Sequence, residues 1–91
     1  MPGYVQNAGT PVNLSASAIV SKSAGSLLGF YVNSTTAGTL VLRSGILSTD
    51  TAVTGTITPA IGWHRFPATF PSGCYATIGA TLDVTLIFAA G

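Results

Sequence analysis

The residues that could do chemistry gather in one stretch of the chain, GWHRFPATFPSGCYATIG, residues 62–79. It holds the only His (His64), the only Cys (Cys74) and the only Trp of the protein. If this stretch forms a hairpin in which Phe66 lies opposite Cys74, then His64 and Cys74 become diagonal neighbours on one face. A Cys beside a His is the smallest arrangement that supports nucleophilic catalysis, so the pair has to be tested first.

Catalysis through His64 and Cys74 needs further groups. The thiolate must be stabilised by a cation or a helix N-terminus, and a third side chain must orient the His. The only acids are Asp50 and Asp83, both distant in sequence, and the pattern predicts no helix. Free Cys is among the most buried residue types. We therefore interpret Cys74 as a small buried core residue, and we predict no catalytic residue and no enzymatic activity.

Other functional motifs are also missing from the sequence. One Cys, one His and two Asp cannot supply a structural zinc or calcium site, and no phosphate loop, GxSxG or HExxH motif is present. We therefore predict no metal and no cofactor. Asp50 is expected to accept hydrogen bonds in a turn, and Asp83 to lie on a strand surface. Two glycosylation-type sequons, at Asn13 and Asn33, are interpreted as chance matches, and Asn33 as a turn residue at the end of a strand.

The composition is that of a compact β protein with very little charge. Charged residues make up 5% of the chain and Glu is absent, whereas soluble domains average about 25%. The three cations Lys22, Arg43 and Arg65 are scattered, which argues against nucleic acid as a partner. No apolar run approaches the roughly 18 residues of a spanning helix, so no membrane association is expected. A 91-residue domain without a disulfide or metal gains stability by oligomerising or by docking on a larger body.

Alternation of apolar and polar residues, broken by Gly, Pro and Ser turns, predicts about eight short strands. The predicted architecture is all-β, a single β-sandwich or jelly-roll domain over 1–91 with mainly antiparallel strands, and a small barrel is the nearest alternative. Residues 1–11 are expected to form an extended N-terminal segment. The predicted strands span 4–6, 12–20, 26–33, 39–43, 53–58, 63–66, 74–78 and 81–88.

The predicted hairpin gives the rare residues of 62–79 two different environments. One side of the hairpin presents His64, Phe66, Cys74 and Ile78 to the core, and the opposite side presents Trp63, Arg65 and Tyr75 to the outside of the protein. Exposed aromatic residues and Arg are enriched at interface hot spots, and exposed aromatics also line sugar-binding surfaces. We therefore predict a protein interface whose candidate residues are Tyr4, Tyr31, Trp63, Arg65 and Tyr75; the alternative is that Trp63 only covers one end of the core.

The order of strands and turns resembles that of a known group of proteins. The segments SAGSLLGFYVNSTTAGTLVLRSG (23–45) and TGTITPAIGWHRFPATFPSGCYATIGATLDVTLIF (54–88) resemble small all-β virion proteins of tailed bacteriophages, most closely capsid decoration or cement proteins. The resemblance implies a non-enzymatic protein on the capsid surface, often a trimer, that binds the major capsid protein of the mature lattice and stabilises it. It carries no motif that assigns functional residues.

Two further expectations follow from this resemblance. The N-terminal sequence MPGYVQNAGT has neither the basic start nor the apolar core of a secretory signal, so the protein is expected to be made in the host cytoplasm and to end up in the virion. Small β folds also serve in head fibres and tails. The alternative function is therefore a carbohydrate-binding or adhesion module of a phage head fibre or tail, in which Trp63 contacts the glycan.

Overall fold

The computed structural model describes residues 9–90, and every element in it is a β-strand. Residues 1–8 of the expected N-terminal segment, which include Tyr4 and the predicted strand 4–6, lie outside the described residues. The described part contains no helix long and apolar enough to cross a membrane. The all-β prediction is confirmed. The five strands are β1 (Thr10–Leu14), β2 (Ala18–Ser21), β3 (Gly25–Ser44), β4 (Gly62–Phe70) and β5 (Cys74–Ala90).

The two long strands, β3 and β5, form the centre of one antiparallel sheet. They are paired from Gly25 opposite Ala90 at one end to Ser44 opposite Cys74 at the other. β4 pairs with the first part of β3. β2 pairs with the first part of β5, and β1 pairs with the second part of β5. The strand order is therefore β1-β5-β3-β4, with β2 beside β5 as well. All five strands belong to one sheet, so the predicted sandwich or jelly-roll of separate sheets is not shown.

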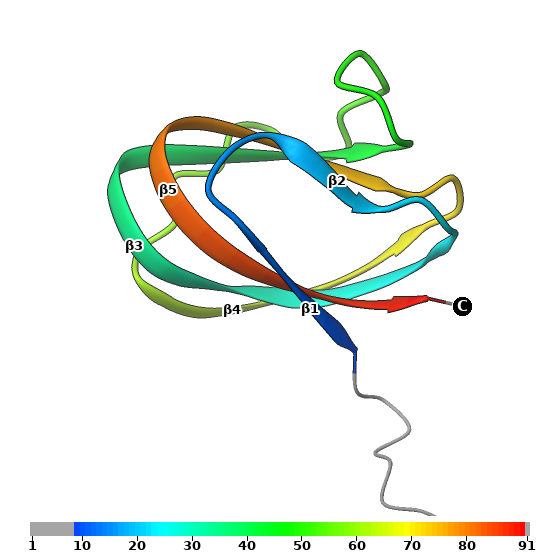
Figure 1. The fold of residues 1–91 in the computed structure, drawn as a ribbon, viewed down its shortest axis with the longest axis horizontal. Coiled ribbons are helices and arrows are strands. Elements are labelled where there is room, and N and C mark those ends of the chain that lie inside the picture. The colour runs from blue at the N-terminus through cyan, green and yellow to red at the C-terminus, as the bar shows by residue number, and fades with distance from the viewer. Residues whose placement is uncertain (1–8, 91) are drawn as a thin grey trace, which may run out of the picture.

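β3 and β5 bend together near their middles, and the sheet folds over onto itself (Figure 1). Ala37 in β3 and Ala80 in β5 both have a φ of 53°, and the register shifts between Thr36 and Ala37. The bend divides the sheet into two facing halves. The β1/β4 half consists of β1, β4, residues 25–35 of β3 and residues 82–90 of β5. The β2 half consists of β2, residues 39–44 of β3 and residues 74–79 of β5.

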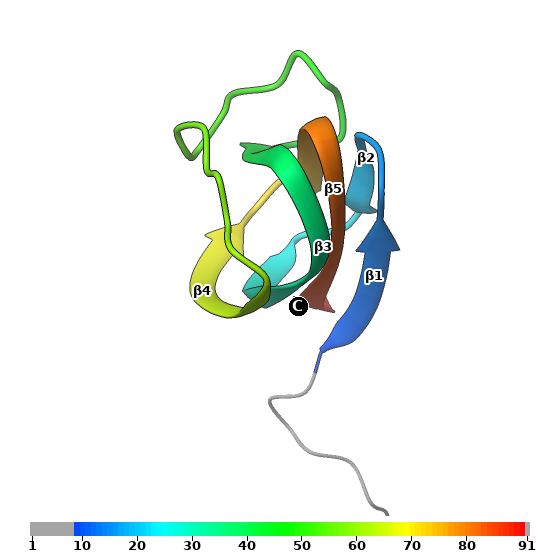
Figure 2. The same cartoon turned by 90° about the vertical axis from the view of Figure 1, so that its left-hand side faces the viewer.

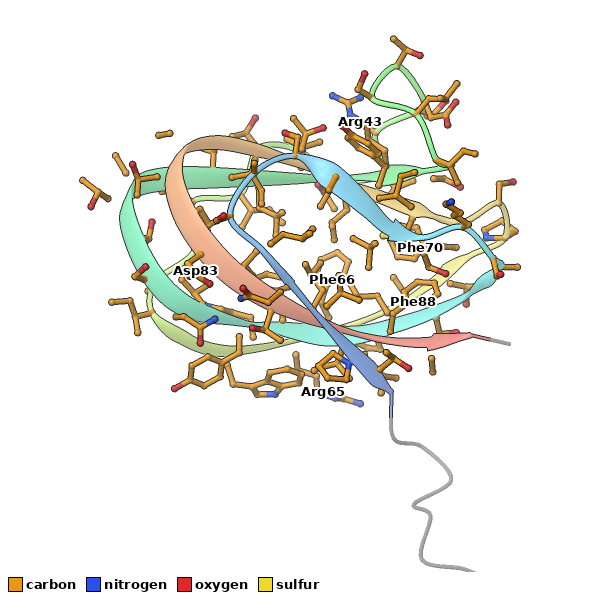
Figure 3. The ribbon with its side chains drawn as sticks, in the orientation of Figure 1. Arg43, Arg65, Phe66, Phe70, Asp83 and Phe88 are labelled. Carbon is orange, nitrogen blue, oxygen red and sulfur yellow. The ribbon has the colours of Figure 1, made fainter. Side chains whose placement is uncertain are left out.

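The hydrophobic core lies between the two halves, and labelled Phe66, Phe70 and Phe88 occupy this space in Figure 3. The rings of Phe70 and Phe88 are 6.2 Å apart between their centroids. Alternation places one side of each strand in this core, as predicted for the last strand. The buried apolar residues are Val20, Leu27, Phe30, Val32, Leu40, Leu42, Phe70, Cys74, Ala76, Leu82, Val84, Leu86 and Phe88.

The prediction of about eight strands is wrong, because two predicted turns are bends inside strands. Segment 34–38 continues β3, and 79–80 continues β5, with backbone pairing retained on both sides of each bend. Both segments contain Gly, a common turn residue, and 34–38 (STTAG) also contains Ser. The long partner strand holds each of them in extended pairing, because a bulge changes strand direction without ending the ladder.

Three other predicted strands also have different bounds. Predicted strand 12–20 is two strands, β1 and β2, separated by 15–17. Segment 53–58 is a loop that touches β3 through isolated bridges, with Leu40 N to Ile57 O at 2.8 Å. β4 continues through Pro67 to Phe70 because it lies at an end of the strand order, where a missing amide donor is tolerated. β1, at the other end, also contains a proline, Pro11.

The positive φ of Ala37 and Ala80 gives a test of the bend. Alanine in this conformation destabilises the folded state by about 1–2 kcal/mol. Glycine avoids this strain, but the larger conformational entropy of its unfolded state offsets part of the gain in stability. We expect Ala37→Gly and Ala80→Gly each to raise the free energy of unfolding by about 0.5–1 kcal/mol, measured by urea denaturation. The matched control Ala68→Gly, in β4, should lower it. Destabilisation by either bend variant would contradict this account of the fold.

Candidate functional site

The structure separates His64 from Cys74, so the predicted hairpin between them is wrong. His64 lies opposite Phe30 of β3, with their rings stacked 5.2 Å apart, and its Nε2 donates to Ala60 O at 2.7 Å. Cys74 lies opposite Ser44 in the other half of the sheet. The error arose at residues 71–73, where the chain crosses from one half of the sheet to the other instead of turning back beside β4.

Cys74 is fully buried, as predicted, with an exposed fraction of 0%. Burial raises the pKa of its thiol from 9.0 to about 12, because the desolvated thiolate is disfavoured. The thiol therefore stays protonated at neutral pH, the opposite of what a nucleophilic Cys needs. The inward directions predicted for Phe66, Cys74 and Ile78 are confirmed, since all three belong to the core or pack against it.

Trp63 and Arg65 both point outward from β4, as predicted, and Trp63 lies opposite Tyr31 on the neighbouring strand. Tyr31 and Trp63 are direct cross-strand partners, and the Trp63 side chain is 50% exposed. The Trp63 ring extends over Gly29, where an added Cβ would lie 2.6 Å from Trp63 Cη2. Ile61, 64% exposed, immediately precedes β4. The surface therefore carries an aromatic pair with an apolar neighbour.

A network of polar side chains lies beside this aromatic pair. Asn13 Nδ2 donates to Asp83 Oδ1 at 2.8 Å and to Thr85 Oγ1 at 3.1 Å. Asn33 Nδ2 donates to the same two oxygens, at 3.1 and 3.0 Å. Thr85 is the direct partner of both Asn13 and Tyr31, so network and aromatics form a continuous surface across four strands. We call this surface the outer face; its residues are Asn13, Tyr31, Asn33, Ile61, Trp63, Arg65, Asp83 and Thr85.

Sequence reasoning missed this network although it singled out some of its members. Asp83 is a strand-surface residue, as predicted, but Asn33 is not at a strand end. It lies within β3 at a register shift between Val32 and Ser34, and this bulge directs its side chain to Asp83. The signal in the sequence is weak: Asn13, Asp83 and Thr85 occupy the polar positions of alternating strands. Only the register shows that they meet.

Tyr75 does not join the other candidate interface residues. It lies in the β2 half, opposite Arg43 and Ile19, whereas Tyr31, Trp63 and Arg65 share the β1/β4 half. The predicted cluster of Trp63, Arg65 and Tyr75 is therefore divided between the two halves of the sheet. Tyr4 is outside the described residues.

A second exposed apolar surface lies on the loop after β3. Ile46, Leu47 and Val53 have exposed fractions of 40%, 58% and 51%. We call residues 45–53 the loop tip, and Figures 1 and 2 show this green segment projecting from the rest of the protein. In Figure 3 the loop tip and Arg43 lie on one side of the molecule and Arg65 lies on the opposite side. The loop tip and the outer face are therefore well separated.

The loop tip is held in place by hydrogen bonds to Asp50, as predicted for a turn acceptor. Asp50 Oδ2 accepts from the amides of Ile46 and Leu47, both at 2.9 Å. Arg43 Nη1 donates to Asp50 O at 3.0 Å, and Gly45 N donates to Gly73 O at 3.0 Å. The one carboxylate of the loop tip is thus turned onto backbone amides, and the loop exposes Ile46, Leu47 and Val53 among the hydroxyl side chains of Ser48, Thr49 and Thr51.

No pocket is present in the structure of residues 9–90. Within the same residues, no three His, Cys, Asp or Glu side chains come close enough to hold a metal ion. The candidate functional features of the described chain are therefore the outer face and the loop tip.

Two glycine substitutions test whether Asp50 organises the loop tip. Gly45 has a φ of +135°, and a Cβ there would collide with the Asp50 carboxylate, whereas a Cβ on Gly55 would touch nothing within 4 Å. We expect Gly45→Ala to lower the free energy of unfolding by about 2 kcal/mol in urea denaturation. Gly55→Ala should leave it unchanged or raise it by up to about 1 kcal/mol. Equal effects of the two substitutions would contradict the described loop geometry.

The raised pKa of Cys74 predicts a specific alkaline dependence of stability. Below pH 9 the thiol is protonated in both the folded and the unfolded state and has no effect. Between pH 9 and about 12 only the unfolded state loses the proton, so the free energy of unfolding falls by about 1.4 kcal/mol per pH unit. Cys74→Ala should remove this slope, measured as the difference between the two proteins. Identical slopes would contradict the burial of an unionised thiol.

Comparisons with known proteins assign no family to this chain. It matches no protein-family model, no curated protein and no solved structure. Its function therefore has to be inferred from its own residues and geometry.

Proposed function

We propose that this protein is a non-enzymatic virion structural protein that decorates the capsid of a tailed bacteriophage and stabilises its mature lattice. The observation that carries the proposal is the loop tip, where Ile46, Leu47 and Val53 are exposed on a loop fixed by Asp50. The resemblance of segments 23–45 and 54–88 to decoration proteins supports the same function. The proposed partner is the major capsid protein.

An ordered loop with exposed apolar side chains is suited to docking into a partner, because little conformational entropy is lost on binding. Association costs less when the binding segment is already ordered, and the hydrogen bonds to Asp50 provide that order before binding. Leu47, the most exposed of the three apolar side chains, fits the role of an anchor that enters a pocket on the partner. The side chain of Arg43 donates to Thr77 Oγ1 and to Asp50 O, so its charge is directed back onto the protein beside the loop.

Stabilisation of the capsid would follow from selective binding. A protein that binds only the expanded lattice shifts the equilibrium towards that state by mass action. Many copies on one shell, and a homo-oligomer with a trimer favoured, would add avidity to modest single contacts. We also propose that the two halves of the bent sheet act as the layers of a small sandwich, which supports the loop tip from the β2 half.

A second candidate function is a carbohydrate-binding or adhesion module of a phage head fibre or tail. The specific observation in its favour is the pair of Tyr31 and Trp63 beside the network of Asn13, Asn33 and Asp83. This outer face lies away from the loop tip (Figure 3). Capsid docking and glycan binding are therefore geometrically compatible in one protein.

Capsid docking through the loop tip is tested by co-sedimentation with expanded capsids and with unexpanded procapsids of the phage that encodes the chain. We expect binding to expanded capsids only, and Leu47→Ser should weaken it about tenfold or more because apolar burial is lost. Trp63→Ala, on the outer face, is the control and should bind normally. A stable monomer with no affinity for either particle would refute the proposed function.

A further inference from the structure

We propose that the outer face is a binding site for a neutral carbohydrate. The site consists of Tyr31 and Trp63 as a stacking surface and of Asn13, Asn33, Asp83 and Thr85 as hydrogen-bonding groups. This inference rests on the second candidate function above and gives it a site and a ligand class. It does not depend on the loop tip.

The aromatic pair provides the apolar part of the site. Sugar rings have an apolar C–H face, which loses little hydration when it is stacked on an aromatic ring. Tyr31 and Trp63 are direct partners on adjacent strands, so their Cβ atoms lie about 5 Å apart and both side chains project from the same face of the sheet. Trp63 extends over Gly29, where the lack of a side chain lets the indole lie against the strand. About half of each aromatic side chain is exposed and is therefore accessible to a ligand.

The polar network provides the specific part of the site. Asp83 Oδ1 accepts from both Asn13 and Asn33, which fixes the position of the carboxylate. The other carboxylate oxygen and the two amide oxygens accept no side-chain hydrogen bond among the described residues, so each has acceptor capacity for ligand hydroxyls. Carboxylate acceptors make stronger hydrogen bonds than neutral groups. Sugar hydroxyls, which donate and accept at close spacing, match this set.

The charge of the outer face selects a neutral ligand. It carries one cation, Arg65, and one anion, Asp83, whose carboxylate accepts hydrogen bonds from Asn13 and Asn33. Such a balanced face offers no net attraction to phosphates or to acidic glycans. A standard protein interface buries about 800 Å² on each partner, with its apolar side chains at the centre and a polar rim around them. Here the apolar side chains Tyr31, Ile61 and Trp63 occupy only one side of the face, beside a polar network.

The test measures binding of the full chain to an array of neutral glycans, followed by isothermal titration calorimetry with the best-bound oligosaccharide. We expect Trp63→Ala to weaken binding about tenfold or more through loss of stacking. Asp83→Asn keeps the shape of the side chain but replaces one carboxylate oxygen, an acceptor, with an NH2 group, a donor. We expect this substitution to weaken glycan binding by a similar factor. Tyr31→Phe keeps the ring and should bind nearly as well as the unchanged protein, whereas Tyr31→Ala should not.

Two controls separate this proposal from the capsid proposal and from self-association. Leu47→Ser, on the loop tip, should lose capsid binding but keep glycan affinity, and Tyr75→Phe, in the β2 half, should change neither. Circular dichroism and urea denaturation of each variant show that it is folded. The proposal is overturned if no neutral glycan binds, or if folded Trp63→Ala and Asp83→Asn bind as well as the unchanged protein. It is also overturned if Trp63→Ala instead dissociates an oligomer in sedimentation velocity and glycan binding is absent.

Discussion

The antiparallel pairing of β3 with β5 is the interaction on which the rest of the structure depends. Each of the other three strands attaches to one of these two, and none pairs only with another peripheral strand. Because β3 and β5 bend at the same place, with Ala37 and Ala80 in the same unusual conformation, both halves of the core close together. A folded single sheet thus achieves what two sheets achieve in a sandwich, which is burial of one apolar face of every strand against another.

The same pairing explains which parts of the fold could be predicted from the sequence. Alternation fixed the inward residues of the last strand, and the burial of Cys74 and the turn role of Asp50 follow from residue chemistry alone. The bends did not follow, because Ala–Gly and Gly–Ala steps look like turns unless the partner strand is known. The partner of β4 was also hidden. Strand pairing over more than thirty residues of sequence, as between Phe30 and His64, depends on the whole topology and leaves no local signal.

The outer face shows the same limit for function. Its polar network is built from residues as far apart as Asn13 and Asp83, 70 positions along the chain. Each residue alone looks like an ordinary surface position, and the sequence directed attention to Cys74, whose thiol is buried and protonated. The exposure of Trp63 and Arg65 was predictable from alternation, but their neighbour Tyr31 and the distance to Tyr75 were set by strand order. Of the rare residues, His64 and Cys74 do not form the site that the sequence suggested, and the common residues Asn and Thr carry the polar surface.

The two prolines of the sheet lie in the strands at its two ends, Pro11 in β1 and Pro67 in β4. A chain with only five charged side chains cannot rely on electrostatic repulsion to keep its copies apart in solution. An imino acid in each end strand removes a donor that an incoming strand would need, which interrupts the template for fibril growth. The β1 and β4 edges of the sheet are therefore poor templates for pairing with the backbone of another chain.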